Sequence, residues 1–343
     1  MKRSDINFFL PPELIASEAL AERSASRMLV VDRKSENYRD SRFVELPDLL
    51  RPSDVLVLND TKVFPARLFG KTESGGNLEI FLVNETSENI WQVLARPAKR
   101  LKIGRRIIFS SELSANVIDK TDDGKVVIQF EADGNINDII DNIGKTPLPP
   151  YIKRERGEPD LDRERYQTIY AKNRGAIAAP TAGLHFTPDI MAALKAKGIT
   201  TATLTLHVGY GTFEPIRVDD LSEHRVLPES FSISEETAEL LNSAQAEKRR
   251  IVAVGTTTTR TLESAMTKHG RFEAESGLAD LTITPGYKFK AVDAMLTNFH
   301  LPESSLLILV STFAGRELIM KAYEYAVKER YRFYSYGDCM FIE

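Results

Sequence analysis

The chain has 343 residues and a formal net charge of -4, with 42% hydrophobic and 27% charged residues. This composition is ordinary for a globular protein and excludes a uniformly basic nucleic-acid binder, while leaving room for a local basic surface. A single cysteine, Cys339, excludes an intramolecular disulfide and Cys-rich metal sites. The N-terminus is too polar for a secretory signal, and residues 306–310, the most apolar stretch, fall far short of the roughly 18 that span a membrane. We expect a cytoplasmic protein of two domains, or of one domain with a large insertion.

The first 60 residues alternate between helical and extended patterns. A short helix is predicted over 12–16, a strand over 27–32, a helical turn over 46–50 and a buried strand over 54–59. That last strand ends in Asn59, Asp60 and Thr61, whose polar side chains suit a turn at the carboxyl end of a strand. We therefore consider these three residues candidates for binding a ligand.

The pattern changes between residues 63 and 149, where short alternating segments are separated by glycine-rich and Asp-Gly turns. Six strands are predicted, over 66–70, 78–83, 90–95, 106–109, 113–118 and 125–130. Their near-regular spacing predicts a small six-stranded antiparallel β-barrel. Because α/β patterns lie on both sides, we interpret residues 63–149 as a barrel inserted into a discontinuous α/β domain, residues 1–62 and 150–343.

Within the predicted barrel, residues 96–106 carry six basic side chains and no acidic one. This basic run consists of Arg96, Lys99, Arg100, Lys102, Arg105 and Arg106. Such a run is most often a solvated loop beside a strand. The alternative is a contact with the phosphates of a nucleic acid, because an acidic protein that gathers positive charge in one place can steer RNA to one face.

The chain then returns to the α/β pattern. Residues 154–170 are densely charged and predict an amphipathic helix or a loop that orders around a ligand. A buried strand is predicted over 175–179, followed by a helix that Thr187 caps and Gly198 ends. The crossing between them holds Pro180, Thr181, Ala182, Gly183 and Leu184. Crossings of this kind bind ligands in many open α/β sheets.

Further strands are predicted over 200–208, 251–255 and 337–343, with helices over 235–249, 304–313 and 316–328. The strand over 200–208 leads into Gly209, Gly211 and Thr212. The strand over 251–255 ends at Gly255 and leads into a turn with Thr256, Thr257 and Arg260, before a helix from Thr261. A hydroxyl-rich turn at the N-terminus of a helix presents free N–H groups, which suit a carboxylate or phosphate.

Four of the five histidines lie at predicted strand ends or in loops, beside Gly, Pro or Thr. They are His185, His207, His224 and His300. A single histidine of this kind is more often structural, but parallel strands place their carboxyl ends on one edge, so four suggest a shared cleft. A metal site is the competing interpretation. We expect none, because the sequence has no HExxH motif and no pair of histidines at helical spacing.

Taken together and in order, the motifs of the chain resemble the S-adenosylmethionine:tRNA ribosyltransferase-isomerase family. The matching segments are LPPELIA (10–16), DVLVLNDT (54–61), PARL (65–68), PLPPYI (147–152), YQT (166–168), AAPTAGLHF (178–186), TLHVG (205–209), VGTT (254–257), RTLE (260–263), PGYKF (285–289), TNFHLP (297–302), YRF (331–333) and SYGD (335–338). They cover nearly the whole chain.

The resemblance implies an α/β domain with an inserted six-stranded barrel. It also implies transfer of the ribosyl part of S-adenosylmethionine to an aminomethyl-deazaguanine at the tRNA wobble position, giving epoxyqueuosine and releasing adenine and methionine. S-adenosylmethionine is then a co-substrate and no separate cofactor is expected. We expect His185 and His207 to transfer protons, with His300 third, and Thr256, Thr257 and Arg260 to hold the methionine carboxylate or a phosphate. Asn298 is expected to bind substrate, and the protein to be a monomer.

Two segments depart from the family pattern. Where the family has His-Pro-Met-His-Ser-Glu, this chain keeps His224 and Glu229 but has Leu227 and Pro228 between them. Where the family has a turn containing Trp, this chain has Leu278. Three functions stay open: the tRNA-modifying enzyme, an S-adenosylmethionine-dependent transferase with another acceptor, and a non-catalytic tRNA-binding protein on the same scaffold.

Overall fold

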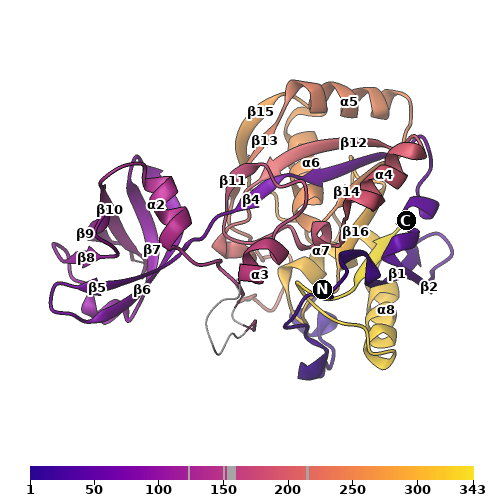
Figure 1. Cartoon of the computed structure of the whole chain (residues 1–343). Coiled ribbons are helices and arrows are strands. Elements are labelled where there is room, and N and C mark those ends of the chain that lie inside the picture. Colours follow the sequence, from indigo (N-terminus) through magenta and orange to yellow (C-terminus); the bar gives the residue numbers. More distant parts are fainter. Residues whose placement is uncertain (123, 150, 153–159, 214–215) are drawn as a thin grey trace.

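A nine-stranded sheet forms the centre of the main body (Figure 1), in the order β15-β13-β12-β3-β14-β16-β17-β1-β2. The computed structural model describes residues 1–122, 124–149, 151–152, 160–213 and 216–343, without the side chains of residues 100, 160, 212 and 213. The strands are β1 (Arg27–Asp32), β2 (Asn37–Arg42), β3 (Val55–Asn59), β12 (Thr200–Leu206), β13 (Glu229–Ile233), β14 (Ile251–Val254), β15 (Glu275–Ala279), β16 (Ala294–Asn298) and β17 (Cys339–Ile342). The central strands β12, β3, β14 and β16 are parallel.

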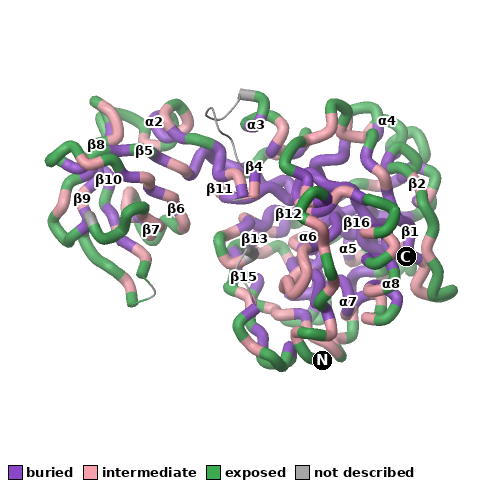
Figure 2. The backbone as a smooth tube through the Cα atoms, turned by 90° about the horizontal axis from the view of Figure 1, so that it is seen from below, coloured by how far each residue is buried: buried purple, intermediate pink, exposed green. Residues whose placement is uncertain are grey.

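Helices cover both faces of this sheet, as its nearly continuous apolar strands require. Val55 and Val57 of β3 face one core and Leu56 and Leu58 face the other. Residues of α1 and α4 join the second core, and those of α5 to α8 join the first, so the buried residues form the layers that Figure 2 shows in purple. These helices are α1 (Leu46–Leu49), α4 (Pro188–Ala196), α5 (Glu235–Ala246), α6 (Thr256–His269), α7 (Ser305–Ala314) and α8 (Arg316–Lys328).

A closed barrel in the order β10-β7-β6-β5-β8-β9 stands apart from the main body in Figure 1. Its strands are β5 (Arg67–Thr72), β6 (Asn77–Ser87), β7 (Ile90–Arg96), β8 (Arg106–Ile108), β9 (Leu113–Lys120) and β10 (Val126–Ala132). Alternate residues such as Leu78, Ile80 and Leu82 point inward and build a core separate from that of the sheet. The predicted fold class, an α/β domain with an inserted six-stranded antiparallel barrel, is confirmed. An unpredicted helix, α2 (Ile136–Ile143), adds Ile139 and Ile140 to this core.

The chain enters the barrel after β4 (Thr61–Val63) and leaves it at Lys145, which pairs with Arg67. Ile152 and Tyr166 already belong to the main core, and β11 (Asn173–Ala176) then pairs with β4 in a small two-stranded parallel sheet. The strand predicted over 175–179 is therefore displaced and belongs to this small sheet, not to the main one. Residues 177–179 continue as buried, irregular chain into a 3-10 helix, η6 (Thr181–His185), and only then into α4. Gly175 permits this course, because it passes directly against the ring of His207. The prediction that a strand of the main sheet leads directly into a helix here was therefore wrong. The strand belongs to the small sheet, and a 3-10 helix precedes α4.

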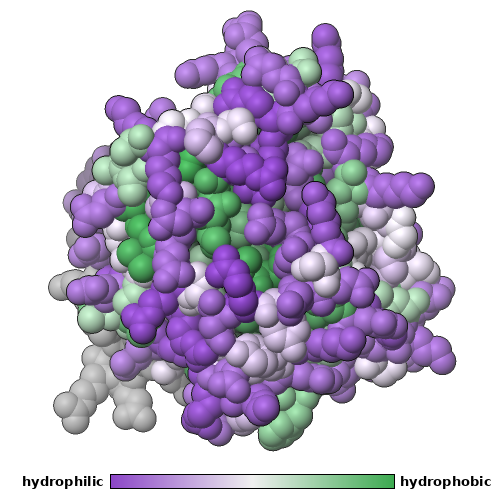
Figure 3. Space-filling model, turned by 90° about the vertical axis from the view of Figure 1, so that its right-hand side faces the viewer, coloured by the Kyte–Doolittle hydropathy of each residue, from purple (hydrophilic) through white to green (hydrophobic). Residues whose placement is uncertain are grey.

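Other differences are local. The helix predicted over 12–16 is a single 3-10 turn, η2 (Pro12–Leu14), and the predicted charged segment contains α3 (Asp160–Arg165), with residues 153–159 outside the described part of the chain. Further 3-10 turns are η1 (Arg3–Ile6), η3 (Arg23–Ala25), η4 (Phe43–Glu45), η5 (Ala98–Arg100) and η7 (Tyr210–Phe213). None of the helices in the described ranges is long and apolar enough to cross a membrane. On the face seen in Figure 3, hydrophilic side chains cover most of the surface.

Candidate active site

The carboxyl ends of β3, β12 and β14 are tied together by one buried side chain. Asn59, only 1% exposed, ends β3. Its Oδ1 accepts hydrogen bonds from the N–H groups of Thr61 and Leu206, both at 3.1 Å. Its Nδ2 donates to the carbonyl of Leu206 at 3.0 Å and to Thr257 Oγ1 at 3.4 Å. Asn59 therefore fixes the position of β12 and the start of α6 relative to β3.

Asp60 is enclosed in the same way. Its carboxylate accepts hydrogen bonds from Thr205 Oγ1 at 2.6 Å and from Asn173 Nδ2 at 3.1 Å. These donors come from β12 and β11, so Asp60 joins the main sheet to the small sheet at the barrel entrance. Asn59 and Asp60 were predicted to bind substrate. In this structure their polar atoms bind other parts of the protein.

His207 follows β12 and is half-buried between the two sheets. Its Nδ1 lies 2.8 Å from Thr61 Oγ1. A Cβ atom on Gly175 would lie 2.7 Å from its ring, so glycine is needed for this packing. Burial lowers the pKa of His207, and the charge of Asp60 opposes that shift. No hydrogen bond found among the described residues uses Nε2. The ring is thus neutral near pH 7 and keeps one nitrogen for a ligand.

His185, in η6, is fully enclosed. Because Asn298 Nδ2 donates to the carbonyl of Tyr334 at 2.9 Å, its Oδ1 must accept from His185 Nε2–H at 3.1 Å. The other ring nitrogen, Nδ1, then accepts from Ser26 Oγ at 2.8 Å. Burial lowers the pKa of His185 to about 4, and the hydrogen bond to Asn298 only partly offsets this. The ring therefore holds Asn298, at the end of β16, in a fixed orientation.

His300 is the imidazole that lines a cavity at the end of β16. Its Nε2 lies 3.0 Å from Thr297 Oγ1, and its main-chain N–H donates to Tyr323 Oη. Burial alone lowers its pKa to about 3. The side chain is therefore neutral at physiological pH.

Two small cavities flank the N-terminus of α6 and share Thr256 and Thr257. Gly255, at φ +92°, turns the chain from β14 into this helix. The first cavity, of about 50 Å³, is lined by Ala179, Pro180, Thr181, Ala182, Val208, Gly255, Thr256, Thr257, Thr297, Asn298, Phe299, His300, Leu306, Tyr334 and Ser335. The second, of about 40 Å³, is lined by His224, Val226, Glu229, Thr256, Thr257, Arg260, Leu281, Thr282, Ile283, Ser305, Leu306 and Leu309. The N–H groups in the first turn of α6, a 14-residue helix, favour an anion at the N-terminus of the helix, between the two cavities.

Arg260 lines the second cavity, and both terminal nitrogens of its guanidinium bind other parts of the protein, while its buried Nε has no hydrogen-bond partner among the described residues. Nη1 pairs with Glu229 Oε2 at 2.8 Å, and Nη2 donates to the carbonyls of Leu227, at 2.7 Å, and Ala279. Glu229 Oε1 in turn accepts from the N–H of Gly209 at 2.7 Å. Burial lowers the pKa of Arg260, and Glu229 opposes that shift. This pair holds β13, β15 and the segment after β12 together.

His224 contacts Ser305 Oγ through Nε2 at 2.8 Å, and burial lowers its pKa. The two departures from the family pattern lie close to this corner. Leu227 is 47% exposed and supplies a carbonyl to Arg260, while Leu278 of β15 is 63% exposed and pairs with Ser230 of β13. Both are large, exposed apolar side chains, and neither lines the second cavity.

The predicted site residues therefore fall into three groups. Those that line the cavities are Pro180, Thr181, Ala182, Gly255, Thr256, Thr257, Asn298 and His300 for the first, and His224, Glu229 and Arg260 for the second. A second group lies outside both cavities: Asn59 and His185 bond to lining residues, whereas Asp60, Thr61 and His207 lie at the junction of the main sheet and the small sheet. The remaining residues lie outside these groups. Gly183 packs against Tyr170, and the carbonyl of Leu184 accepts a hydrogen bond from Arg23. Gly209 lies beside Glu229, and Gly211 lies beside Leu227. The side chain of Thr212 lies outside the described part of the chain.

Sequence reasoning missed several polar residues of the site. Ser26 bonds His185, Ser305 bonds His224, and Thr297 bonds His300. Tyr334 and Ser335 line the first cavity. Ser335 and Thr297 stood in motifs that the resemblance used, whereas Ser26 carried no signal, because it lies 159 positions from the histidine it contacts. Within the described residues, no group of three or more His, Cys, Asp or Glu side chains is placed to hold a metal ion.

The basic run occupies the end of β7, η5 and the start of β8. Arg96, Lys99 and Lys102 are exposed, Arg105 is partly buried, and Arg106 pairs with Glu131 at 3.1 Å. The side chain of Arg100 is not among those described. Sequence reasoning missed apolar neighbours on the outward side of the barrel: Phe69 of β5 is 53% exposed, and the exposed Ile108 of β8 pairs with Lys71.

A family model described as queuosine biosynthesis protein matches residues 3–342. The chain belongs to the queuosine biosynthesis protein family. Two relatives named S-adenosylmethionine:tRNA ribosyltransferase-isomerase, from Syntrophotalea carbinolica and Caldanaerobacter subterraneus, are 48% and 47% identical over the full length of both chains. A solved S-adenosylmethionine tRNA ribosyltransferase from Thermotoga maritima is 37% identical, with a TM-score of 0.56, and the match covers 99% of this chain and 100% of that one.

Proposed function

We propose that this protein is an S-adenosylmethionine:tRNA ribosyltransferase-isomerase. The reaction moves the ribosyl part of S-adenosylmethionine to the aminomethyl-deazaguanine at the tRNA wobble position, forms epoxyqueuosine, and releases adenine and methionine. The observation that carries the proposal is the full-length match to relatives of that name. The arrangement of imidazoles, hydroxyls and a helix N-terminus at one edge of the sheet suits this chemistry. S-adenosylmethionine acts as co-substrate, and no further cofactor or metal is proposed.

The reaction needs a base that removes a proton from the ribose carbon bonded to sulfur, where the sulfonium stabilises the carbanion. We propose His207 for this step. If Nδ1–H donates to Thr61 Oγ1, the lone pair of Nε2 is available to accept a proton. The lowered pKa of His207 keeps the ring in its basic form at neutral pH. The imidazolium formed can then return a proton, for example to the departing adenine.

The other imidazoles have different surroundings, which support different roles. Both ring nitrogens of His185 are engaged, so we propose that it positions Asn298 in the cavity wall. Its predicted role in proton transfer stays a prediction. For His300, Thr297 Oγ1 donates to the carbonyl of Asn298 and can accept from His300 Nε2–H, which leaves Nδ1 as a second proton acceptor.

We propose that Thr256, Thr257 and the first-turn N–H groups of α6 hold the methionine carboxylate or an oxyanion formed on ring opening. Arg260, whose guanidinium is already paired with Glu229, would then act by keeping that wall in place. Because the two cavities are small, S-adenosylmethionine would have to merge them on binding, by movement of shared side chains such as Leu306. Removing the Thr257 hydroxyl should raise the KM for S-adenosylmethionine.

The tRNA is proposed to contact the barrel. Lys71, Arg106 and Ile108 share the outward side of β5 and β8 with Phe69, so cations for phosphates lie beside an aromatic ring on which a base can stack. The protein is proposed to act as a monomer in the cytoplasm, where its tRNA substrate is found.

The second candidate, an S-adenosylmethionine-dependent transferase with another acceptor, is prompted by Leu227 and Leu278, which place exposed apolar side chains where the chain departs from the family pattern. One assay separates the candidates. The protein is incubated with S-adenosylmethionine and tRNA carrying the aminomethyl-deazaguanine precursor, and adenine is quantified. Release that requires the precursor tRNA supports the proposed enzyme. Release without that requirement indicates another acceptor, and no release under any condition would leave only tRNA binding.

A further inference from the structure

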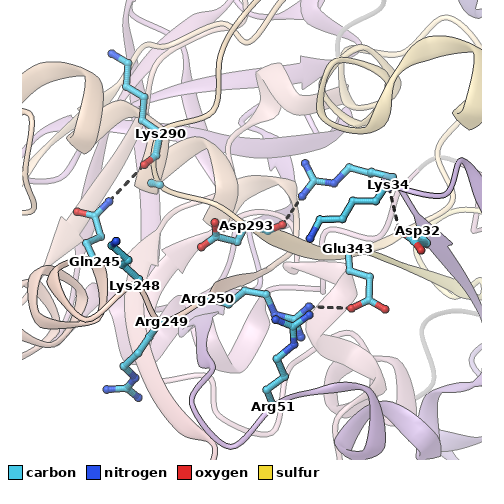
Figure 4. A pocket seen from close by; sticks show the side chains of 12 residues that line it. Asp32, Lys34, Arg51, Gln245, Lys248, Arg249, Arg250, Lys290, Asp293 and Glu343 are labelled. Carbon is cyan, nitrogen blue, oxygen red and sulfur yellow. Dashed lines mark hydrogen bonds and ion pairs between the residues drawn. The ribbon is translucent and has the colours of Figure 1, made fainter.

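A third, much larger cavity lies at the opposite end of the main sheet from the candidate active site. It has a volume of about 640 Å³, and twelve residues line it (Figure 4). They come from the segments that precede β3, β14 and β16 and from the ends of β1 and β17. The candidate active site lies at the other ends of β3, β14 and β16, so the sheet itself separates the two. No step of the proposed reaction uses this cavity.

The lining is strongly cationic, although the chain as a whole is acidic. Seven cationic side chains face three carboxylates: Arg33, Lys34, Arg51, Lys248, Arg249, Arg250 and Lys290 against Asp32, Asp293 and Glu343. Gln245 and Ala291 complete it. The lining contains no aromatic or large apolar side chain, so it offers nothing on which a base or acyl chain could pack. Charge is the property that the cavity can recognise.

All three carboxylates already have partners. Glu343 pairs with Arg250 Nη1 at 2.8 Å. Asp293 Oδ2 accepts from the main-chain N–H of Ile251 at 2.8 Å. Asp32 accepts from the turn that follows it, including the N–H of Lys34 at 2.8 Å. Hydrogen bonds do not remove the charge of these carboxylates, so the seven cationic side chains outnumber the three anionic ones by four.

Six of the seven cations are of two kinds, and the seventh, Lys34, is exposed in the turn after β1. Arg33, Arg249 and Arg250 are held by the protein: Arg250 pairs with Asp54 at 2.7 Å, Arg249 donates to the carbonyl of Ser53, and Arg33 donates to that of Phe313. They form a fixed positive wall. Arg33 Nε is buried and finds no hydrogen-bond partner among the described residues.

By contrast, Arg51, Lys248 and Lys290 are exposed. Their side-chain nitrogens make no hydrogen bond or ion pair with any residue that the structure describes. They project around the cavity from three different segments (Figure 4). A multivalent anion in the cavity would gain charge-assisted hydrogen bonds from cations of more than one segment.

We propose that this cavity binds a small polyphosphate ligand through its di- or triphosphate group. Phosphate oxygens match the many N–H donors of the lining, and the volume lies within the range of small-ligand sites, roughly 300–1,000 Å³. The ligand would cross-link the segments before β3, β14 and β16 and so stabilise the fold. This site is separate from the proposed transferase activity and does not depend on it.

The test uses inorganic pyrophosphate as the probe and the full chain as the protein. Isothermal titration at low ionic strength should give one saturable site on the unaltered protein. The variant R51Q/K248Q/K290Q should bind pyrophosphate at least about tenfold more weakly, because three charge-assisted contacts are lost. The control K195Q/K321Q/K328Q removes three exposed cations elsewhere and should change the affinity less than about twofold, since screened distant charges contribute little.

Three outcomes would overturn the proposal. The first is the absence of saturable pyrophosphate binding. The second is equal weakening in the control variant, which would indicate a general charge effect. In the third, a short RNA hairpin displaces pyrophosphate and loses affinity in the R51Q/K248Q/K290Q variant, which would identify RNA as the occupant. Adenine release and circular dichroism, measured in parallel, should be unchanged in both variants, so a failed proposal here is distinguishable from a failed proposal for the active site.

Discussion

At the scale of single residues, His207 combines a fixed ring with a nitrogen that no described residue uses. Replacing it with Gln should lower the rate of adenine release by about 10²–10⁴-fold, the usual contribution of a general base, with little change in the KM for S-adenosylmethionine. Because burial lowers the pKa of His207 below the ordinary histidine value, the rate should be unchanged at pH 6.5 and above and should fall at some lower pH, as the ring becomes protonated. His269→Gln, which removes the histidine at the end of α6, is the control. Full turnover by the His207 variant would refute the assignment.

The burial of His185 predicts how the stability of the folded protein depends on pH. Its folded-state pKa of about 4 lies below the ordinary histidine value, so between pH 6.5 and 4 the unfolded chain binds a proton that the folded protein does not. Stability should therefore fall as the pH falls through that window, by about 2–3 kcal/mol for this side chain. His300 acts in the same direction. Urea unfolding at pH 6.5 and 4.5 should show a smaller loss for His185→Gln than for the unaltered protein. An identical pH dependence in both proteins would argue against a buried neutral ring.

At the scale of elements, β11 lies so close to the end of β12 that Gly175 leaves no room for a side chain. Gly175→Ala would place a Cβ atom 2.7 Å from the His207 ring and push the ring out of place. We expect adenine release to drop by at least about tenfold, as misplacement of a reacting group generally causes, while the unfolding midpoint changes little. Gly277→Ala, whose new Cβ would lie 3.4 Å from the Phe231 ring on β13, is the matched control. Unchanged activity in Gly175→Ala would show that the ring position does not matter.

The elements also show what sequence patterns can and cannot predict. The barrel was predictable because its strands alternate and are bounded by turns such as Gly75-Gly76. By contrast, β13 and β15, with sequences ESFSI and ESGLA, contain few β-branched residues and were missed. They are stabilised by pairing with each other, an interaction between segments far apart in the chain.

The sequence predicted that α6 begins at Thr261, five residues after its actual start at Thr256. A run of threonines disfavours a helix, but Thr258, Thr259 and Thr261 donate their hydroxyl hydrogens to the carbonyls four residues earlier. In the site, residues at strand ends were predictable because they follow from local pattern. The partners of the histidines were not, since each comes from a different part of the chain.

At the scale of the whole molecule, the barrel is expected to supply electrostatic affinity for tRNA and the main body the chemistry. Lys99→Gln with Lys102→Gln should raise the KM for tRNA and leave kcat at saturating tRNA unchanged. The slope of log affinity against log salt should become shallower by roughly 1.5, because two phosphate contacts are lost. Lys120→Gln with Lys145→Gln, outside the basic run, serves as the control. The same salt dependence in both variants would mean that tRNA binds elsewhere.

The pairing of Arg67 with Lys145 has a consequence for how this architecture can change. Because these two residues are neighbours, the barrel segment begins and ends at adjacent points. A segment with adjacent ends and its own apolar core can be excised, lengthened or exchanged for a different module without stretching the sheet that hosts it. The architecture therefore allows a different domain to replace the barrel while the main sheet and the candidate active site stay unchanged.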